Sequence, residues 1–358
     1  IHDVLRLQSE VALDVAEKIK VELTLLDREE IIGNVAVRAE AHEAYLKGRY
    51  YVDQRTPEAL NTGLQYFEDS IEEDSSYALA YAGISDTYCL MAAYSLENPD
   101  IIYPKAKQAA LRAIELDDRL AEAHTSLAIV RWIYEWEFDD AEEMFKRAVL
   151  LNPNYTRAHH WYALYLAYME RYDEAIDQMS KARAVDPVSL IANAALGLVY
   201  YYAESYDIAL EQSVQTLDMD DQFFPAYTVQ GRSYTKMGMH EEAIEAFEKV
   251  IELSGRRSSV LSLIAHPLAA SGNMKRAEEL YDELRERSAD EYISPFDMAI
   301  LAIGLKRTSE ALDWLERAYA EKTVDIMSMN AEPLLNDLRD EPRYIELTER
   351  IGLPLNLD

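Results

Sequence analysis

Small residues recur along this chain at a nearly constant spacing, and this repeat constrains the fold more than any other feature. Each one stands four positions before a bulky apolar or medium-sized residue. The positions are Gly63, Ala106, Ala141, Ala175, Ala209, Ala243, Ala277 and Ala311. After steps of 43 and 35 residues, the last five steps are each 34 residues. Such a period predicts a stack of similar units, none of which can bury its apolar face alone.

Each repeated small residue lies in a segment with the pattern of an amphipathic helix. Residues 241–255 (EEAIEAFEKVIELSG) carry apolar side chains at i, i+3, i+4 and i+7 behind an acidic first turn. Pro153 and Pro187 end two of these helices. A partner helix precedes each one, marked by a small residue with an aromatic residue three positions later, as at Gly197 and Tyr200. Since antiparallel helices approach closely only at small side chains, each period predicts a helical hairpin whose bulky residues fill the space to the next hairpin.

The period and these positions together resemble the tetratricopeptide repeat family. The resemblance implies an all-α fold, a right-handed superhelical solenoid of about eight helix-turn-helix hairpins over residues 41–323. The expected repeats are 41–77, 78–120, 121–155, 156–189, 190–223, 224–257, 258–291 and 292–323. Insertions near Thr56 and from Ser95 to Pro104 lengthen the first two.

Two terminal segments flank the expected repeats. Residues 1–40 contain an amphipathic pattern from Asp3 to about Val21, which fits a cap, the end of an upstream domain or a helix that forms a homodimer. Residues 324–358 predict short capping helices, because exposed ends of a solenoid need a polar-backed cover. The apolar residues expected to cover the last repeat are Leu335, Leu338, Tyr344, Leu347 and Ile351.

Four stretches extend the resemblance to the tetratricopeptide tails of multidomain prokaryotic signalling proteins. They are HDVLRLQSEVALDVAEKIKVELT, AYLKGRYYVDQRTPEAL, LNPNYTRAHHWYALYLAYMERYDEAI and LRDEPRYIELTERIGLP. In that group a winged-helix regulator, a nucleotide cyclase or a kinase precedes the tail, often with a TolB-like domain between them. The resemblance implies a non-enzymatic interaction or regulatory module within a larger signalling or transcription-regulatory protein.

The charge of the chain and its missing motifs exclude several classes of function. With 66 acidic and 35 basic residues, the net charge of -31 repels phosphate, so this segment should bind neither nucleic acid nor an anionic membrane. Cys89 is the single cysteine, and none of the seven histidines has metal-binding spacing. Without a phosphate-binding loop or a nucleophile elbow, we expect no enzyme, metal or cofactor. The compartment stays open, with the cytoplasm expected first and an extracytoplasmic location if a membrane span precedes Ile1.

By the register of the family, positions 2, 5, 9, 12 and 13 of each repeat line a concave groove. Applied here, that register gives nine candidate residues for binding a partner. They are Trp132, Ile133, His160, Leu164, Tyr168, Tyr201, Tyr202, Arg232 and Lys236. The aromatic and apolar centre beside two basic residues predicts docking of a partner peptide or helix. Chaperone-binding members carry lysine at position 5 and asparagine at position 9, and their absence here disfavours a chaperone adaptor.

Three alternatives remain open from the sequence. The aromatic side chains at these positions also fit an inner wall that is simply packed core. The chain could instead be an assembly element that mediates homo-oligomerisation, or a sensor whose groove takes a small ligand. The sequence does not name the partner.

Overall fold

The computed structural model describes residues 38–94 and 96–355, and every regular element within these ranges is a helix. The chain divides into two compact units, one up to Leu127 and one from Ala128 onward, and each is described by itself. The helix expected from Asp3 to Val21 lies outside the described residues, so its roles as a cap or a dimer contact stay predictions.

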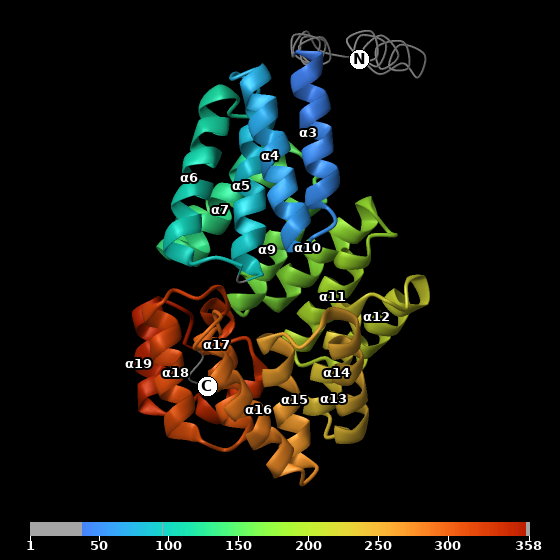
Figure 1. The fold of residues 1–358 in the computed structure, drawn as a ribbon, viewed down its shortest axis with the longest axis vertical. Coiled ribbons are helices and arrows are strands. Elements are labelled where there is room, and N and C mark those ends of the chain that lie inside the picture. The colour runs from blue at the N-terminus through green and yellow to red at the C-terminus, as the bar shows by residue number, and fades with distance from the viewer. Residues whose placement is uncertain (1–37, 95, 356–358) are drawn as a thin grey trace. The chain divides into compact units, whose positions relative to one another are not determined.

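The first unit is built from consecutive helical hairpins (Figure 1). They are α3 (Ala39–Val52) with α4 (Pro57–Glu73), and α5 (Ala78–Ala93) with α6 (Pro99–Leu116), followed by α7 (Ala121–Ile129). Local chemistry starts two of these helices. Thr56 accepts a hydrogen bond from the Ala59 amide at 3.2 Å at the start of α4, and Asn98 accepts one from the Asp100 amide at 2.8 Å at the start of α6.

The second unit continues the pattern, and helices that are neighbours in the chain pack against each other. The π-helix η1 (Val130–Glu135) extends α7 and precedes α8 (Phe138–Leu151). The following pairs are α9 (Thr156–Tyr168) with α10 (Tyr172–Val185), α11 (Leu190–Tyr202) with α12 (Tyr206–Met219), α13 (Phe224–Lys236) with α14 (His240–Ser254), α15 (Ser258–Ala270) with α16 (Met274–Arg287), and α17 (Pro295–Gly304) with α18 (Thr308–Ala320). Two short 3₁₀-helices, η2 (Val324–Ser328) and η3 (Pro333–Leu338), then lead to α19 (Pro342–Ile351). The predicted all-α architecture of helical hairpins is confirmed.

Bulky side chains fill the space between hairpins where the neighbouring residue is glycine. Gly48 of α3 and Gly83 of α5 both face the ring of Phe67 in α4. A Cβ atom at either glycine would lie only 2.6 or 2.7 Å from that ring. Phe67 therefore joins its own hairpin to the next one, and no larger residue fits at the two glycines.

A residue with left-handed backbone ends the first helix of each hairpin in the second unit. These residues are 34 apart: Trp136, Glu170, Glu204, Gly238, Gly272 and Lys306. At Glu170 the amide donates to the Ala167 carbonyl at 3.0 Å, and the next amide, of Arg171, donates to the Leu166 carbonyl at 2.9 Å. This pair of bonds satisfies carbonyl groups that the helix end leaves open. Because only two of the six residues are glycine, residue type alone does not reveal the motif.

The third repeat contains one residue more than the repeats that follow, and η1 accommodates it. Ala128 precedes its equivalent Ala163 by 35 residues, whereas Trp136 precedes its equivalent Glu170 by 34. The extra residue therefore lies between Ala128 and Trp136, where the backbone forms the π-helix. A π-helix takes up one residue more per turn, so the side chains after it keep their faces only if the register shifts by one.

The repeated small residues mark the contacts inside each hairpin, and Ala209→Leu tests this. Ala209 is 0% exposed, and a Cβ atom built at Gly197 of α11 would lie 3.4 Å from its carbonyl oxygen. Overpacking this contact should lower the free energy of unfolding by about 1–3 kcal/mol. Leucine forms helices nearly as well as alanine, so helix propensity does not explain such a loss.

The matched control is Glu211→Leu, two residues further along the same helix at an exposed position. Its effect on stability should stay below about 0.5 kcal/mol. Thermal and denaturant unfolding of both variants give the comparison. A neutral Ala209→Leu together with a damaging Glu211→Leu would show that the hairpin contact is wrongly assigned.

Candidate binding surface on the inner wall

Side chains spaced 34 residues apart line one face of the first helices in the second unit. One column consists of Tyr134, Tyr168, Tyr202 and Lys236, and a second of Leu164, Leu198, Arg232 and His266. We call these eight residues the inner wall. Residues 322–338, which follow α18 and contain η2 and η3, contact side chains of this wall, and we call them the closing segment.

Glu332 anchors the closing segment through its carboxylate. One oxygen accepts a hydrogen bond from the Tyr201 hydroxyl at 2.5 Å, and the other forms an ion pair with the Arg232 guanidinium. Next to it, the Lys236 ammonium donates to the Pro333 carbonyl at 2.8 Å. Glu332 is only 1% exposed. Removing one partner of such a buried pair leaves an uncompensated charge and typically costs about 3–5 kcal/mol.

Further contacts hold both ends of the closing segment. The Lys322 ammonium donates to the Tyr134 carbonyl at 3.0 Å and lies 4.6 Å from the centre of the Tyr134 ring. At the other end, the Asn336 amide donates to the Glu204 carboxylate at 3.0 Å. The apolar side chains of the segment that are fully buried are Ile326, Met327, Met329, Leu335 and Leu338. The segment thus combines polar anchors to several repeats with fully buried apolar side chains.

The helices expected at the C-terminal end form there, but they do more than the cap that the sequence indicates. Tyr344, Leu347 and Ile351 are buried in α19, which packs against α18. Leu335 and Leu338 instead belong to η3 in the closing segment. Adjacent parts of the C-terminal segment thus contact α18 and the inner wall, and the capping role stays a prediction.

Trp132 is buried between the hairpins, and its ring centre lies 5.3 Å from that of Tyr168 on the inner wall. Its side chain is 1% exposed, and its ring centre lies 5.6 Å from that of Tyr165 and 6.3 Å from that of Phe145. The register equated Trp132 and Ile133 with positions 12 and 13. The extra residue in η1 moves those positions to Ile133 and Tyr134, so Trp132 precedes position 12 in the shifted register, and its role in binding a partner stays a prediction.

The other predicted groove residues differ in how far they are covered. Tyr201 and Tyr202 are buried at 0% and 4% exposure, and Ile133 at 2%. His160, Leu164, Tyr168, Arg232 and Lys236 are half-buried. The rings of Tyr168 and Tyr202 meet edge to face at 5.5 Å, which joins two repeats along the wall. The sequence pattern missed Tyr134 and the closing segment, since it located neither the extra residue nor the contacts of the tail.

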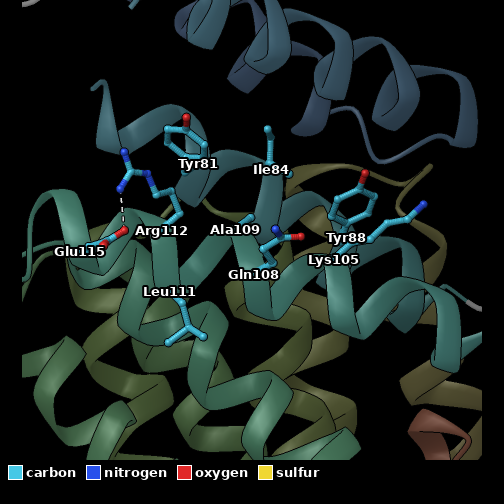
Figure 2. Close-up of a pocket in the computed structure, with 9 residues that line it drawn as sticks. All are labelled: Tyr81, Ile84, Tyr88, Lys105, Gln108, Ala109, Leu111, Arg112 and Glu115. Carbon is cyan, nitrogen blue, oxygen red and sulfur yellow. Dashed lines mark hydrogen bonds and ion pairs between the residues drawn. The ribbon is translucent and has the colours of Figure 1, made fainter. Parts of the chain in front are cut away.

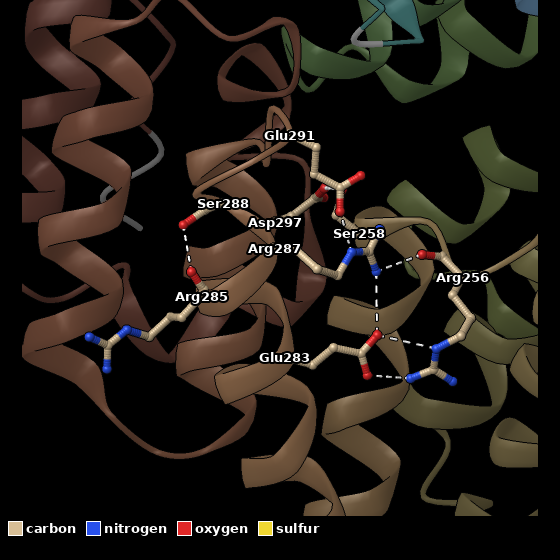
Figure 3. A network of polar contacts seen from close by, with 8 residues as sticks. All are labelled: Arg256, Ser258, Glu283, Arg285, Arg287, Ser288, Glu291 and Asp297. Atoms are coloured by element: carbon tan, nitrogen blue, oxygen red, sulfur yellow. Dashed lines mark hydrogen bonds and ion pairs between the residues drawn. The ribbon is translucent and has the colours of Figure 1, made fainter.

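Two carboxyl groups interact electrostatically at this site, Asp297, which is 8% exposed, and Asp325 of the closing segment, which is half-buried. Asp297, in the first turn of α17, accepts a hydrogen bond from the Ser258 hydroxyl at 2.7 Å, and Figure 3 shows the two residues together. Burial, followed by the charge of Asp325 in η2, raises the pKa of Asp297, while the Ser258 bond and Arg232 oppose the rise. Burial also raises the pKa of Asp325. The positive charge of Arg232 lowers this pKa, and the negative charge of Glu332 raises it further. Ionising both acids therefore costs more free energy in the folded chain than in the unfolded chain.

The first unit has a separate surface cavity of about 580 Å³ between α5 and α6. Figure 2 shows its lining in two rows, one from each helix. The Lys105 ammonium lies 5.7 Å from the centre of the Tyr88 ring, and the Arg112 guanidinium lies 6.0 Å from that of Tyr81. The cavity contains none of the residues that the family register indicates.

Neither a metal site nor a membrane span was found within the described ranges. No three histidine, cysteine, aspartate or glutamate side chains there are grouped to hold a metal ion. No described helix combines the length and the apolar character that crossing a bilayer requires.

Comparison with protein families agrees with the hairpins. One model of the tetratricopeptide repeat matches residues 137–187 and 163–222, and another matches residues 224–256. The chain is a tetratricopeptide repeat protein. The matched residues of these repeats correspond to the helices from α8 to α14.

Solved structures agree with this fold. Yeast Tom70 has a TM-score of 0.51 and 15% identity, covering 87% of this chain and 68% of that one. A tetratricopeptide repeat protein from Parabacteroides merdae has a TM-score of 0.50 and 14% identity, covering 75% of this chain and 100% of that one. At these identities the likeness concerns the fold, and stacked repeats of this kind present extended surfaces to protein partners.

Among curated proteins, the transcriptional regulator HilA of Salmonella typhimurium is 28% identical over 109 residues. The match covers 30% of this chain and 20% of HilA. The tetratricopeptide chain thus spans about a fifth of the length of this relative.

The shifted register of the third repeat is tested by comparing Trp132→Ala with Tyr134→Ala. Trp132 lies in the core, so its truncation should lower the free energy of unfolding by about 3–5 kcal/mol. Tyr134 is half-buried and its ring contacts Lys322, so its truncation should cost about 1 kcal/mol. Denaturant unfolding measures both values. Equal losses, or a larger loss for Tyr134→Ala, would contradict the shift.

Asp297 and Asp325 predict a pH dependence that Asp325→Asn should reduce. An acid whose pKa is raised by folding stabilises the folded state below its ordinary pKa, near 4, and this contribution is lost as the pH rises through the folded value. Between pH 5 and pH 8 the melting temperature of Asp325→Asn should therefore rise relative to the parent chain. Asp337→Asn, at an exposed position, serves as the control, and its melting temperature should change with pH as that of the parent chain does. If the melting temperatures of all three proteins change with pH in the same way, Asp297 and Asp325 do not cause the pH dependence.

Proposed function

We propose that this chain is a protein-interaction module of a larger regulatory protein and binds a partner peptide or helix on the inner wall of its second unit. The observation that supports this is the closing segment. Side chains from successive repeats hold an irregular stretch of polypeptide there through a carboxylate, a carbonyl group and apolar contacts. A wall that holds one such segment has the chemistry to hold another.

The accessible part of the wall lies in the fourth and fifth repeats. His160, Leu164 and Leu198 are half-buried there, whereas Tyr201 and Glu332 are almost completely covered. The two leucines form a half-buried apolar strip that continues to Tyr168, so it suits the apolar face of a partner helix or an extended segment. We place the first contact of the partner on this strip.

The regulatory context rests on two further observations. The relative named as a transcriptional regulator, HilA, matches part of this chain, and the wider resemblance is to tails of signalling proteins. The net charge of -31 opposes direct binding to nucleic acid. We therefore assign this segment to recognition of a protein partner.

Selection of peptides against the full chain tests the proposal. Peptides from a displayed random library should bind the parent chain and lose at least about 30-fold in affinity for the double variant Leu164→Glu/Leu198→Glu, because the change charges an apolar strip. Val214→Glu places the same charge at an exposed site on α12, 48% exposed in the parent, and should leave the affinity unchanged. Titration calorimetry gives the affinities, and circular dichroism verifies that each variant is folded.

Two outcomes would reject the proposal. One is that no peptide is enriched above background. The other is that enriched peptides bind the double variant as tightly as they bind the parent.

A further inference from the structure

Two of the three donors to the Glu332 carboxylate lie on first helices of the hairpins, and the third is the Leu334 amide of the closing segment itself, at 3.1 Å. Tyr201 lies on α11, and Arg232 and Lys236 lie one turn apart on α13. Tyr201 and Arg232 each take one carboxylate oxygen, and Lys236 binds the carbonyl group of the following residue. A hydroxyl and a guanidinium aimed at one carboxylate select a charged acceptor over a neutral one.

The occupant also shows which neighbours the site accepts. After Glu332, the carbonyl of a proline accepts a hydrogen bond from Lys236, and the proline nitrogen has no N–H that would need an acceptor. Two leucines follow, at 7% and 0% exposure. The combination is a glutamate, a proline and two apolar residues in a tight turn.

We propose that Tyr201, Arg232 and Lys236 form a recognition site for a partner segment with this chemistry, an acidic residue followed by proline and leucines, and that the closing segment competes for it. The inference rests on the proposed function, because it assumes that a partner reaches the inner wall. It goes further by naming the class of ligand and the intramolecular competitor.

Several features make the closing segment a replaceable occupant. Its regular parts are two 3₁₀-helices of five and six residues, whose hydrogen-bond geometry is poorer than that of an α-helix. Asp325 lies in the first of them beside Asp297, and its ionisation opposes burial. A tethered occupant acts as a competitor at millimolar effective concentration, so a partner has to bind tightly or meet a loosened segment.

The experiment uses the full chain and a fluorescent synthetic peptide with the sequence of residues 329–340. A second peptide has glutamine in place of its glutamate. In the chain, Glu332→Gln removes the charge of the competitor and leaves the wall intact. This variant should bind the glutamate peptide at least about 10-fold more tightly than the parent chain does, and the glutamine peptide should show no such gain.

Variants with changed wall residues should remove the gain in affinity. Adding Arg232→Gln to Glu332→Gln should abolish the gain. Adding Lys236→Gln should reduce it, and this half-buried site keeps the test valid if the arginine variant does not fold. Hydrogen exchange should also show faster exchange of residues 330–338 in Glu332→Gln than in the parent.

The inference is overturned if residues 330–338 stay equally protected in Glu332→Gln and the peptide binds no variant. It is equally overturned if both peptides bind alike, or if Glu332→Gln forms a concentration-dependent dimer, since the occupant would then be a second copy. Failure here leaves the proposed function standing if selected peptides still depend on Leu164 and Leu198. Loss of that dependence rejects the proposed function itself.

Discussion

Close approach of two helices at one small residue is the constraint on which the rest of the structure depends. The alanines at 175, 209, 243, 277 and 311 are fully buried at this contact. A larger side chain there would separate the hairpin and move the bulky residue four positions later away from its neighbours. Each first helix is thereby fixed against its partner, and its other face is presented in the same way every 34 residues.

The regular presentation of that face explains how the wall can bind polypeptide. Tyr134, Tyr168, Tyr202 and Lys236 form a column because the period places them at the same position of successive repeats. The chain fills part of this wall with its own closing segment, through a carboxylate that is almost completely removed from water. In this intramolecular contact a carboxylate binds to the wall, although the protein as a whole is strongly acidic.

Electrostatics in the second unit has two opposing parts. The pair of Glu332 and Arg232 favours the closed arrangement, while Asp297 and the half-buried Asp325 oppose it once they ionise. Arg232 serves both, since it pairs with one carboxylate and partly offsets the charge of the other two. The stability of the closing segment thus depends on pH more than that of a segment held by apolar contacts alone.

The sequence by itself determined the hairpins, because apolar spacing, small contact residues and helix-ending prolines act over a few turns of chain. It also predicted the residues of a partner-binding groove, and that binding role stays a prediction. Only the tertiary structure located the extra residue in η1, which moves Trp132 into the core and brings Tyr134 to the wall. Only the tertiary structure joined Glu332 to Arg232, 100 residues earlier in the chain. A contact of this kind follows from where the folded repeats bring the tail, and no local pattern encodes it.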